Sequence, residues 1–216
     1  MKSFLVIGMG HFGKHLADRL QRMGNEVMII DKCVEKIEDL APDFQDAQIG
    51  DCTSKNLLKS LDVEDFDVCF VTVGDNFQSS LEISYLLKEL GAKCVVAEVG
   101  RDVQEKFLLR NGADYVIYPE RDMASRMAVK YSANNVFDYI ELSPEYGIFE
   151  IPPMEAWVGK SIRELDIRGK YGMNVLGVKS QDSIRPMPGV DYVFTGEEHV
   201  VVLGNKDQVI KITNKK

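Results

Sequence analysis

Long apolar runs, closely spaced cysteines and an excess of positive charge are all missing from this chain. No apolar run approaches the about 20 residues that a membrane-spanning helix needs. The four cysteines include no C-x-x-C pair, so neither a zinc site nor a redox dithiol is predicted, and reduced thiols in a cytoplasm are the simplest interpretation. The net charge of −8 argues against nucleic-acid binding, which needs a basic surface. The first apolar segment begins almost at the N-terminus, so we expect no signal peptide.

The first 135 of the 216 residues alternate between apolar strand-like segments and helical segments. Strands are expected at 3–7, 26–31, 45–49, 67–73, 93–98 and 114–118, and helices near 12–23, 33–40, 54–60, 77–90 and 102–111. The strands are continuous apolar runs, which is typical of strands covered on both faces. The pattern predicts an α/β fold, a Rossmann-like doubly wound parallel sheet between two helix layers.

The remaining residues, 136–216, predict a second, smaller α+β domain. Short alternating segments lie at 137–142, 147–151, 173–179 and 199–203, and one helical piece starts at Ser161, where Glu164 completes a capping box. A Met-rich helix at about 119–134 leads out of the first domain, 1–135. Its apolar side chains either pack on a sheet or form a docking face for another subunit.

A glycine-rich turn follows the first expected strand directly. Gly8, Gly10 and Gly13 form a G-x-G-x-x-G motif, in which they allow a tight turn, close approach of a phosphate and close helix packing respectively. The next helix would point its unpaired N–H groups and positive dipole end at that phosphate. Asp31 ends the second strand, where its carboxylate can accept hydrogen bonds from both ribose hydroxyls. Together these features predict a nucleotide site.

Two further segments follow neighbouring strands. Asp51 and Cys52 come after the third strand and would flank an adenine, although Asp51 could instead cap the following helix. Val73, Gly74 and Asp75 come after the fourth strand, where Gly74 would let the far half of the ligand lie against backbone. Asp75 is equally consistent with a helix N-cap.

Two pairs of polar residues raise the question of a metal. His11 and His15 are one helical turn apart, but a cation there would oppose the helix dipole, so a hydrogen bond from His11 to a phosphate is favoured. Glu120 and Asp122 begin a later helix, where the dipole alone favours acids. The functional alternative is Mg²⁺ or Ca²⁺ held against a phosphate.

A small NAD-dependent oxidoreductase is the alternative function. Such an enzyme needs a substrate pocket and a group that handles the proton accompanying hydride transfer. The second domain has one histidine, His199, in a strand-like run, and neither a P-loop lysine nor a G-x-S-x-G motif is present in the chain. A nucleotide-sensing module that is not an enzyme is therefore favoured.

The order of the motifs resembles the RCK (regulator of K⁺ conductance) family, the cytosolic regulatory subunits of Trk/Ktr potassium uptake systems. The resemblance covers nearly the whole chain and rests on the glycine motif with Asp31, on Gly50-Asp51-Cys52-Thr53, Leu86-Leu87-Lys88-Glu89-Leu90, Gly112-Ala113-Asp114, Tyr118-Pro119-Glu120-Arg121-Asp122-Met123, Asn135-Val136-Phe137-Asp138-Tyr139-Ile140 and Ile167-Arg168-Gly169-Lys170-Tyr171-Gly172-Met173-Asn174-Val175. It implies an RCK_N Rossmann domain and an RCK_C (TrkA_C) domain. It further implies dimers and octameric rings at the inner face of the cell membrane, beneath a membrane potassium-translocating subunit.

The resemblance also implies ligands. Adenine nucleotides, ATP or ADP, would contact Gly8, Gly10, Gly13, Asp31, Asp51 and Cys52, which match positions in the family. The further residues predicted to line the same site are His11, Phe12, Lys32, Val73, Gly74 and Asp75. Glu120 matches a family glutamate that holds a divalent cation, Mg²⁺ or Ca²⁺, near the ATP phosphates.

A second ligand implied by the resemblance is cyclic di-AMP, in the second domain. The matching residues are Ile162, Ile167, Arg168, Asn174, Val175 and Pro188. Arg168 would pair with a phosphate and Asn174 with a base edge, while the aliphatic residues pack on the bases. The alternative is that Arg168 and Asn174 belong to a solvated turn.

Two positions depart from the family pattern. His11 stands where close relatives have an arginine that reaches the terminal phosphate of a neighbouring subunit's nucleotide, and a shorter, usually neutral side chain would discriminate ATP from ADP more weakly. Glu98 adds a negative charge where some relatives have a basic residue. Both departures leave NAD(H) or AMP open as the natural ligand, and Asp31 disfavours only the 2′-phosphate of NADP.

Overall fold

The chain folds into two compact units. The computed structural model describes residues 1–181 and 183–214, and its first unit comprises Met1–Arg121 while its second starts at Asp122. Across these described ranges, no helix has both the length and the apolar composition needed to cross a lipid bilayer.

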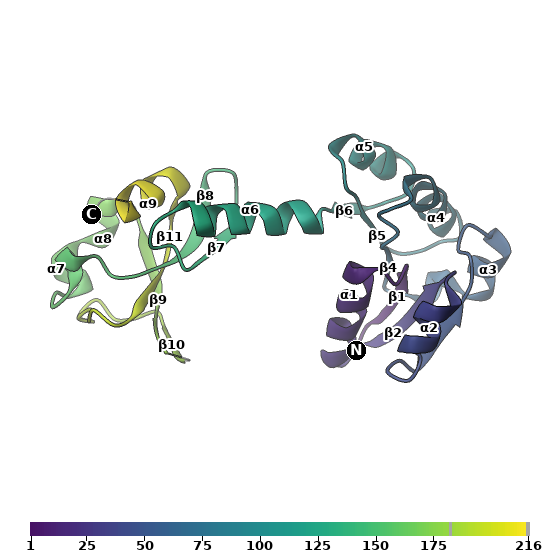
Figure 1. Ribbon diagram of the computed structural model, residues 1–216, viewed down its shortest axis with the longest axis horizontal. Helices are drawn as coiled ribbons and strands as arrows, with labels where there is room; N and C mark the ends of the chain where they lie inside the picture. Colours follow the sequence, from purple (N-terminus) through teal and green to yellow (C-terminus); the bar gives the residue numbers. More distant parts are fainter. Residues whose placement is uncertain (182, 215–216) are drawn as a thin grey trace. The chain divides into compact units, whose positions relative to one another are not determined.

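The first unit is built on a six-stranded sheet in which every neighbouring pair of strands is parallel (Figure 1). The strand order is β3-β2-β1-β4-β5-β6. The strands are β1 (Ser3–Ile7), β2 (Glu26–Asp31), β3 (Asp46–Ile49), β4 (Val68–Val71), β5 (Val95–Glu98) and β6 (Tyr115–Ile117). The chain adds strands on one side of β1 and then crosses to the other side at β4, so a topological switch point lies between β1 and β4.

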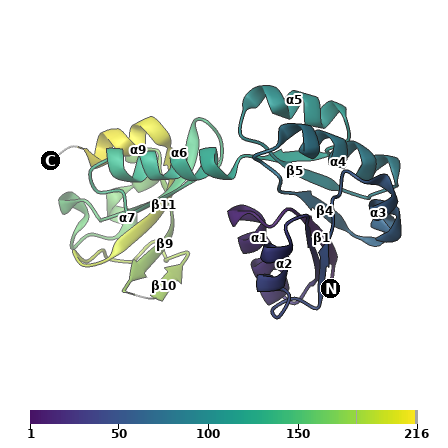
Figure 2. The same cartoon turned by 45° about the vertical axis from the view of Figure 1, so that its right-hand side comes forward.

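Helices cover both faces of this sheet, which confirms the predicted fold class (Figure 2). The helices are α1 (His11–Arg22), α2 (Val34–Leu40), α3 (Lys55–Ser60), α4 (Phe77–Glu89) and α5 (Asp102–Arg110), with a 3₁₀ turn at Val63–Asp65. Because side chains alternate along a strand, Phe4 and Val6 of β1 pack in one core with α1 and α2, whereas Leu5 and Ile7 pack in the other with α3, α4 and α5. The apolar strand sequences are explained by this double coverage.

The second unit contains a five-stranded antiparallel sheet of order β10-β9-β11-β8-β7. Its strands are β7 (Asp138–Glu141), β8 (Tyr146–Ile151), β9 (Asn174–Ser180), β10 (Ser183–Pro186) and β11 (His199–Asn205). Its helices are α7 (Ile162–Leu165), α8 (Ile167–Tyr171) and α9 (Lys206–Thr213), with a 3₁₀ turn at Glu155–Trp157. The predicted capping box is present in α7, where Ser161 and Glu164 exchange hydrogen bonds of 3.2 and 2.7 Å.

Trp157, the one tryptophan of the chain, lies at the centre of the second unit's core. It is fully buried and contacts the rings of Tyr171 and Phe194. Within the described residues its indole N–H has no hydrogen-bond partner.

The Met-rich helix α6 (Pro119–Ser132) shows both of the faces that its sequence left open. Val129 is buried in the core of the second unit, together with Ala133 just beyond the helix end. Met123 and Tyr131 are exposed, at 53% and 78%. One face of α6 is therefore core, and the other presents apolar side chains to solvent.

Close packing between α1 and the sheet depends on two glycines. Gly8 has a φ of +102°, and a Cβ there would lie 2.6 Å from the Thr72 carbonyl oxygen. A Cβ on Gly13 would lie 2.1 Å from the Gly8 carbonyl oxygen and 2.5 Å from Thr72 Oγ1. All three distances are shorter than any tolerated contact, so only glycine allows α1 to begin this close to β1 and β4.

We expect Gly13→Ala to destabilise the first unit by about 1–3 kcal/mol, because α1 must move away from the sheet to make room for the methyl group. Denaturant unfolding measures this change in the free energy of unfolding. Gly10→Ala is the matched control, since a Cβ at Gly10 meets nothing within 4 Å. Equal destabilisation by both substitutions would contradict the packing role of Gly13.

Candidate nucleotide-binding site

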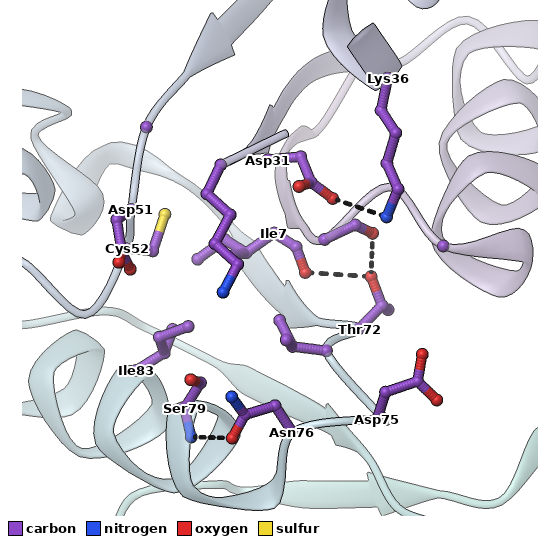
Figure 3. Close-up of a pocket in the computed structure, with 16 residues that line it drawn as sticks. Ile7, Asp31, Lys36, Asp51, Cys52, Thr72, Asp75, Asn76, Ser79 and Ile83 are labelled. Carbon is purple, nitrogen blue, oxygen red and sulfur yellow. Dashed lines mark hydrogen bonds and ion pairs between the residues drawn. The ribbon is translucent and has the colours of Figure 1, made fainter. Parts of the chain in front are cut away.

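A crevice opens at the carboxyl ends of the first unit's strands, at the topological switch point (Figure 3). Its volume of about 260 Å³ is close to the lower end of the about 300–1,000 Å³ usual for small-molecule sites. It is lined by Ile7, Gly8, Gly10, Asp31, Lys32, Lys36, Gly50, Asp51, Cys52, Thr72, Val73, Gly74, Asp75, Asn76, Ser79 and Ile83. Residues that follow four different strands thus meet in one place.

The glycine-rich turn forms the floor of the crevice beside the start of α1. Gly10 is the N-cap residue of α1 and has no side chain to occupy the helix end, and the first turn of α1 contains no acidic residue. The first N–H groups of the helix and its positive dipole end therefore remain available for an anion. The buried Thr72 hydroxyl lies 2.7 Å from the Gly8 carbonyl oxygen and 3.0 Å from that of Ile7, which fixes the turn against β4.

Asp31 is held at the end of β2 by backbone groups. Its Oδ2 accepts a 2.6 Å hydrogen bond from the Met9 N–H, and its Oδ1 accepts a 2.8 Å hydrogen bond from the Cys33 N–H. Lys36 of α2 completes the set, with its Nζ 3.5 Å from Oδ2 (Figure 3). The two carboxylate oxygens offer about four acceptor sites, and Met9, Cys33 and Lys36 use three of them, so Asp31 can accept from two ribose hydroxyls once the long contact to Lys36 is released.

Asp51 and Cys52 form the opposite wall after β3. Asp51 Oδ1 accepts hydrogen bonds from the N–H and the hydroxyl of Thr53, at 3.0 and 2.8 Å, and the backbone hydrogen bond is the main reason that the pKa of Asp51 is lowered. The alternative that Asp51 caps the following helix is wrong, because the N-cap residue of α3 is Ser54 and Asp51 only stabilises the turn before it. Burial, followed by the charges of Asp51 and Asp31, raises the pKa of Cys52 to about 12, so its thiol is neutral.

The segment after β4 contradicts the alternative that Asp75 is a helix N-cap. Asn76, rather than Asp75, is the N-cap residue of α4, because its Oδ1 accepts a 3.1 Å hydrogen bond from the Ser79 N–H. Figure 3 shows Asp75 at the same edge of the crevice as Thr72. Asp75 therefore lines the crevice without capping the helix.

The structure gathers all the predicted nucleotide-binding residues except His11, Phe12 and Gly13 in the lining of the crevice. Those three residues form the first turn of α1, where their backbone N–H groups are the relevant atoms. The lining residues that were not among the predicted site residues are Ile7, Lys36, Gly50, Thr72, Asn76, Ser79 and Ile83. Only Asn76 had a recognisable signal, an amide residue three positions before Ser79 at a helix start.

The metal hypotheses find no preformed site in the part of the chain that the structure describes. No group of three His, Cys, Asp or Glu side chains is close enough to hold an ion there. Glu120 lies in the first turn of α6. Its charge contributes to raising the pKa of Glu98, at the end of β5. The Mg²⁺ or Ca²⁺ site at Glu120 stays a prediction.

The residues predicted to bind cyclic di-AMP lie on α7, on α8, at the start of β9 and just after β10. The Met187 N–H donates a 2.8 Å hydrogen bond to the Leu176 carbonyl, which brings Pro188 beside Val175. Arg168 on α8 and Asn174 at the start of β9 are exposed, and Ile162 is partly buried. Ile167 differs from the expectation, because its side chain is only 2% exposed and belongs to the core.

The fold and the crevice together define a two-domain protein whose first unit is Rossmann-like, and comparison with known proteins assigns its family. The TrkA-N domain model matches residues 4–119 and the TrkA-C domain model matches residues 147–216. The chain belongs to this family of Ktr and Trk potassium uptake proteins. It is 38% identical to Ktr system potassium uptake protein C of Bacillus subtilis over 94% of this chain and 92% of that protein. It is 35% identical to Ktr system potassium uptake protein A of the same organism over 99% of this chain and 96% of that protein.

Solved structures support the fold. The RCK domain of GsuK superimposes with a TM-score of 0.69 at 20% identity, covering 100% of this chain and 48% of that chain. The NAD(P)-binding domain of an exopolyphosphatase-related protein from Archaeoglobus fulgidus superimposes with a TM-score of 0.53 at 27% identity, covering 58% of this chain and 92% of that chain. The first unit is therefore of the type found in RCK and NAD(P)-binding domains.

We expect alkylation of the native protein at pH 8 to modify Cys33 and to spare Cys52 and Cys69. Burial raises the pKa of both spared thiols to about 12, so only about one molecule in ten thousand carries the reactive thiolate at that pH. Cys33 is partly exposed. Peptide mass spectrometry after iodoacetamide treatment measures this, with the unfolded protein as control, in which all four cysteines should react. Labelling of Cys52 as fast as Cys33 in the native protein would contradict this assignment.

Proposed function

We propose that the chain is a regulatory subunit of a Ktr/Trk-type potassium uptake system and not an enzyme. It acts from the cytoplasmic side of the membrane through a potassium-translocating partner subunit. Support comes from two relatives named as Ktr system potassium uptake proteins, each matched over more than nine-tenths of both chains. In this proposal residues 1–135 sense nucleotide and residues 136–216 carry a second regulatory site.

The observation that carries the nucleotide proposal is the arrangement of Gly10 and Asp31 at the crevice. An uncapped helix end offers N–H groups to a phosphate, and a carboxylate held by two backbone N–H groups faces the place where the ribose of that nucleotide would lie. The ligand is an adenine nucleotide, ATP or ADP, or alternatively NAD(H) or AMP. The likeness of the first unit to a domain described as NAD(P)-binding supports this class of ligand.

Ligand binding would control the partner by shifting the shape of an assembly. A ligand shifts such an equilibrium only to the extent that it binds one shape better than the other. We propose self-association as a dimer and an octameric ring, and a divalent cation, Mg²⁺ or Ca²⁺, at Glu120 beside the ATP phosphates. The exposed apolar face of α6, with Met123 and Tyr131, is available for self-association.

Cyclic di-AMP is the proposed ligand of the second unit. Arg168 is an exposed cation that can pair with a phosphate, and Asn174 is an exposed amide that can read a base edge. Val175 and Pro188 provide neighbouring apolar surface for a base. Ile167 supports this surface from within the core rather than lining it.

We expect Asp31→Ala to weaken nucleotide binding by about tenfold to a hundredfold, because hydrogen bonds to a charged acceptor contribute about 1.5–3 kcal/mol. Isothermal titration of the intact protein with ATP, ADP, AMP and NADH measures the affinities. Asp39→Ala on the exposed side of α2 is the matched control and should bind as the unchanged protein does. Unchanged affinity in Asp31→Ala would refute the ribose assignment, and consumption of NADH with a substrate would favour the oxidoreductase alternative.

We expect Arg168→Ala to weaken cyclic di-AMP binding at least tenfold while leaving nucleotide binding to the first unit unchanged, because it removes a charged phosphate partner. Titration of the intact protein with cyclic di-AMP measures this. Lys170→Ala, an exposed cation on the same helix, serves as control. If the unaltered protein does not bind cyclic di-AMP, the second site must be abandoned.

A further inference from the structure

Charge is distributed unevenly along the strand ends that border the crevice. Lys32 and Lys36 lie beside Asp31 after β2, on the side where the ribose and adenine are proposed to bind. On the other side of the switch point, Asp75 follows β4, Glu98 ends β5 and Glu120 follows β6. Three successive strands of the sheet therefore have an acid at or just beyond their carboxyl ends, and of these Asp75 lines the crevice.

Glu98 lies directly behind the part of the crevice wall that Gly74 forms, although it is not itself a lining residue. A Cβ built on Gly74, which lines the crevice, would lie 3.2 Å from Glu98 Cδ and 3.3 Å from its Oε1. The side chain is partly buried, and among residues 1–181 and 183–214 its carboxylate has no hydrogen-bond or ion-pair partner. Burial first, and then the charges of Glu120 and Asp75, raise the pKa of Glu98.

We propose that Glu98 makes the crevice select its ligand by the charge of the ligand's far half, with NAD⁺ preferred over NADH and ADP over ATP. The inference rests on the proposed nucleotide function. If Asp31 holds the ribose and the start of α1 holds the first phosphate, the remainder of the ligand must extend along Gly74 towards Glu98.

Oxidised nicotinamide carries a positive charge and reduced nicotinamide carries none, although the two rings have nearly the same shape. A partly buried carboxylate with no ion partner therefore attracts the first ring more strongly than the second. A third phosphate, in contrast, brings negative charge to three acids and is disfavoured. When no divalent cation is bound, Asp75, Glu98 and Glu120 act on the ligand through their negative charges.

The test compares Kd values for NAD⁺, NADH, ADP, ATP and AMP, measured with the intact protein at pH 8 without divalent cations. The unaltered protein should bind NAD⁺ about tenfold more tightly than NADH, and Glu98→Gln should reduce this ratio to less than about threefold. Glu26→Gln is the matched control, since it removes an equal charge at the opposite end of the same sheet and should keep the ratio. Glu98→Gln should change the affinity for AMP by less than about twofold, because AMP ends at the first phosphate.

The pH dependence gives an independent readout. Because the pKa of Glu98 is raised, the preference for NAD⁺ should increase as pH rises through that pKa and the carboxylate becomes charged, and Glu98→Gln should abolish the slope. The charges of Asp75 and Glu120, which act on Glu98, remain present in both proteins. If the protein binds AMP but has equal affinities for NAD⁺ and NADH, this inference alone is overturned. The same holds if Glu98→Gln leaves the ratio of these two affinities unchanged. A protein that binds neither AMP nor any other nucleotide would overturn the proposed function as well.

Discussion

The contact between the glycine-rich turn and β4 is the constraint on which the crevice depends. Gly8 and Gly13 bring the start of α1 against the Thr72 backbone and side chain, and the Thr72 hydroxyl contacts the carbonyl oxygens of the same turn. Since β1 and β4 are neighbours on either side of the switch point, this single contact sets both the floor and one wall. The helix end takes its position from this contact, and the Asp31 carboxylate is tied to the same turn by its hydrogen bond from the Met9 N–H.

The parallel sheet could be predicted because the same sequence pattern is repeated for every strand. Each strand is an apolar run of suitable length, and each is followed by a helical segment. The C-terminal helix α9 was missed for a physical reason. Its β-branched residues Val209, Ile210 and Ile212 favour strand locally, whereas the Asn205 cap, which accepts from the Gln208 N–H at 3.2 Å, and the complete burial of Val209 favour helix. Tertiary packing decided against the local preference.

The lining residues that follow strands could be predicted from the sequence, whereas those that come from helices could not. Residues such as Asp31, Asp51 and Gly74 follow strands, and the rule that ligands lie at carboxyl ends places them together. Lys36 and Ile83 come from α2 and α4, and their approach to the crevice depends on how each helix crosses the sheet. Periodicity alone contains no information on that crossing. The same limit explains Ile167, whose apolar character is equally consistent with a surface contact and with the core position that it occupies.

The single tryptophan has a practical consequence for spectroscopy. Trp157 belongs to the core of the second unit, and the first unit contains no tryptophan at all. Its emission therefore reports on the unfolding of one unit only, whereas circular dichroism averages over both. Because the indole N–H is sealed away from water and packed between two aromatic rings, that emission should start at short wavelength and shift to the red when this core melts. A second transition seen by circular dichroism but silent in fluorescence would belong to the Rossmann unit.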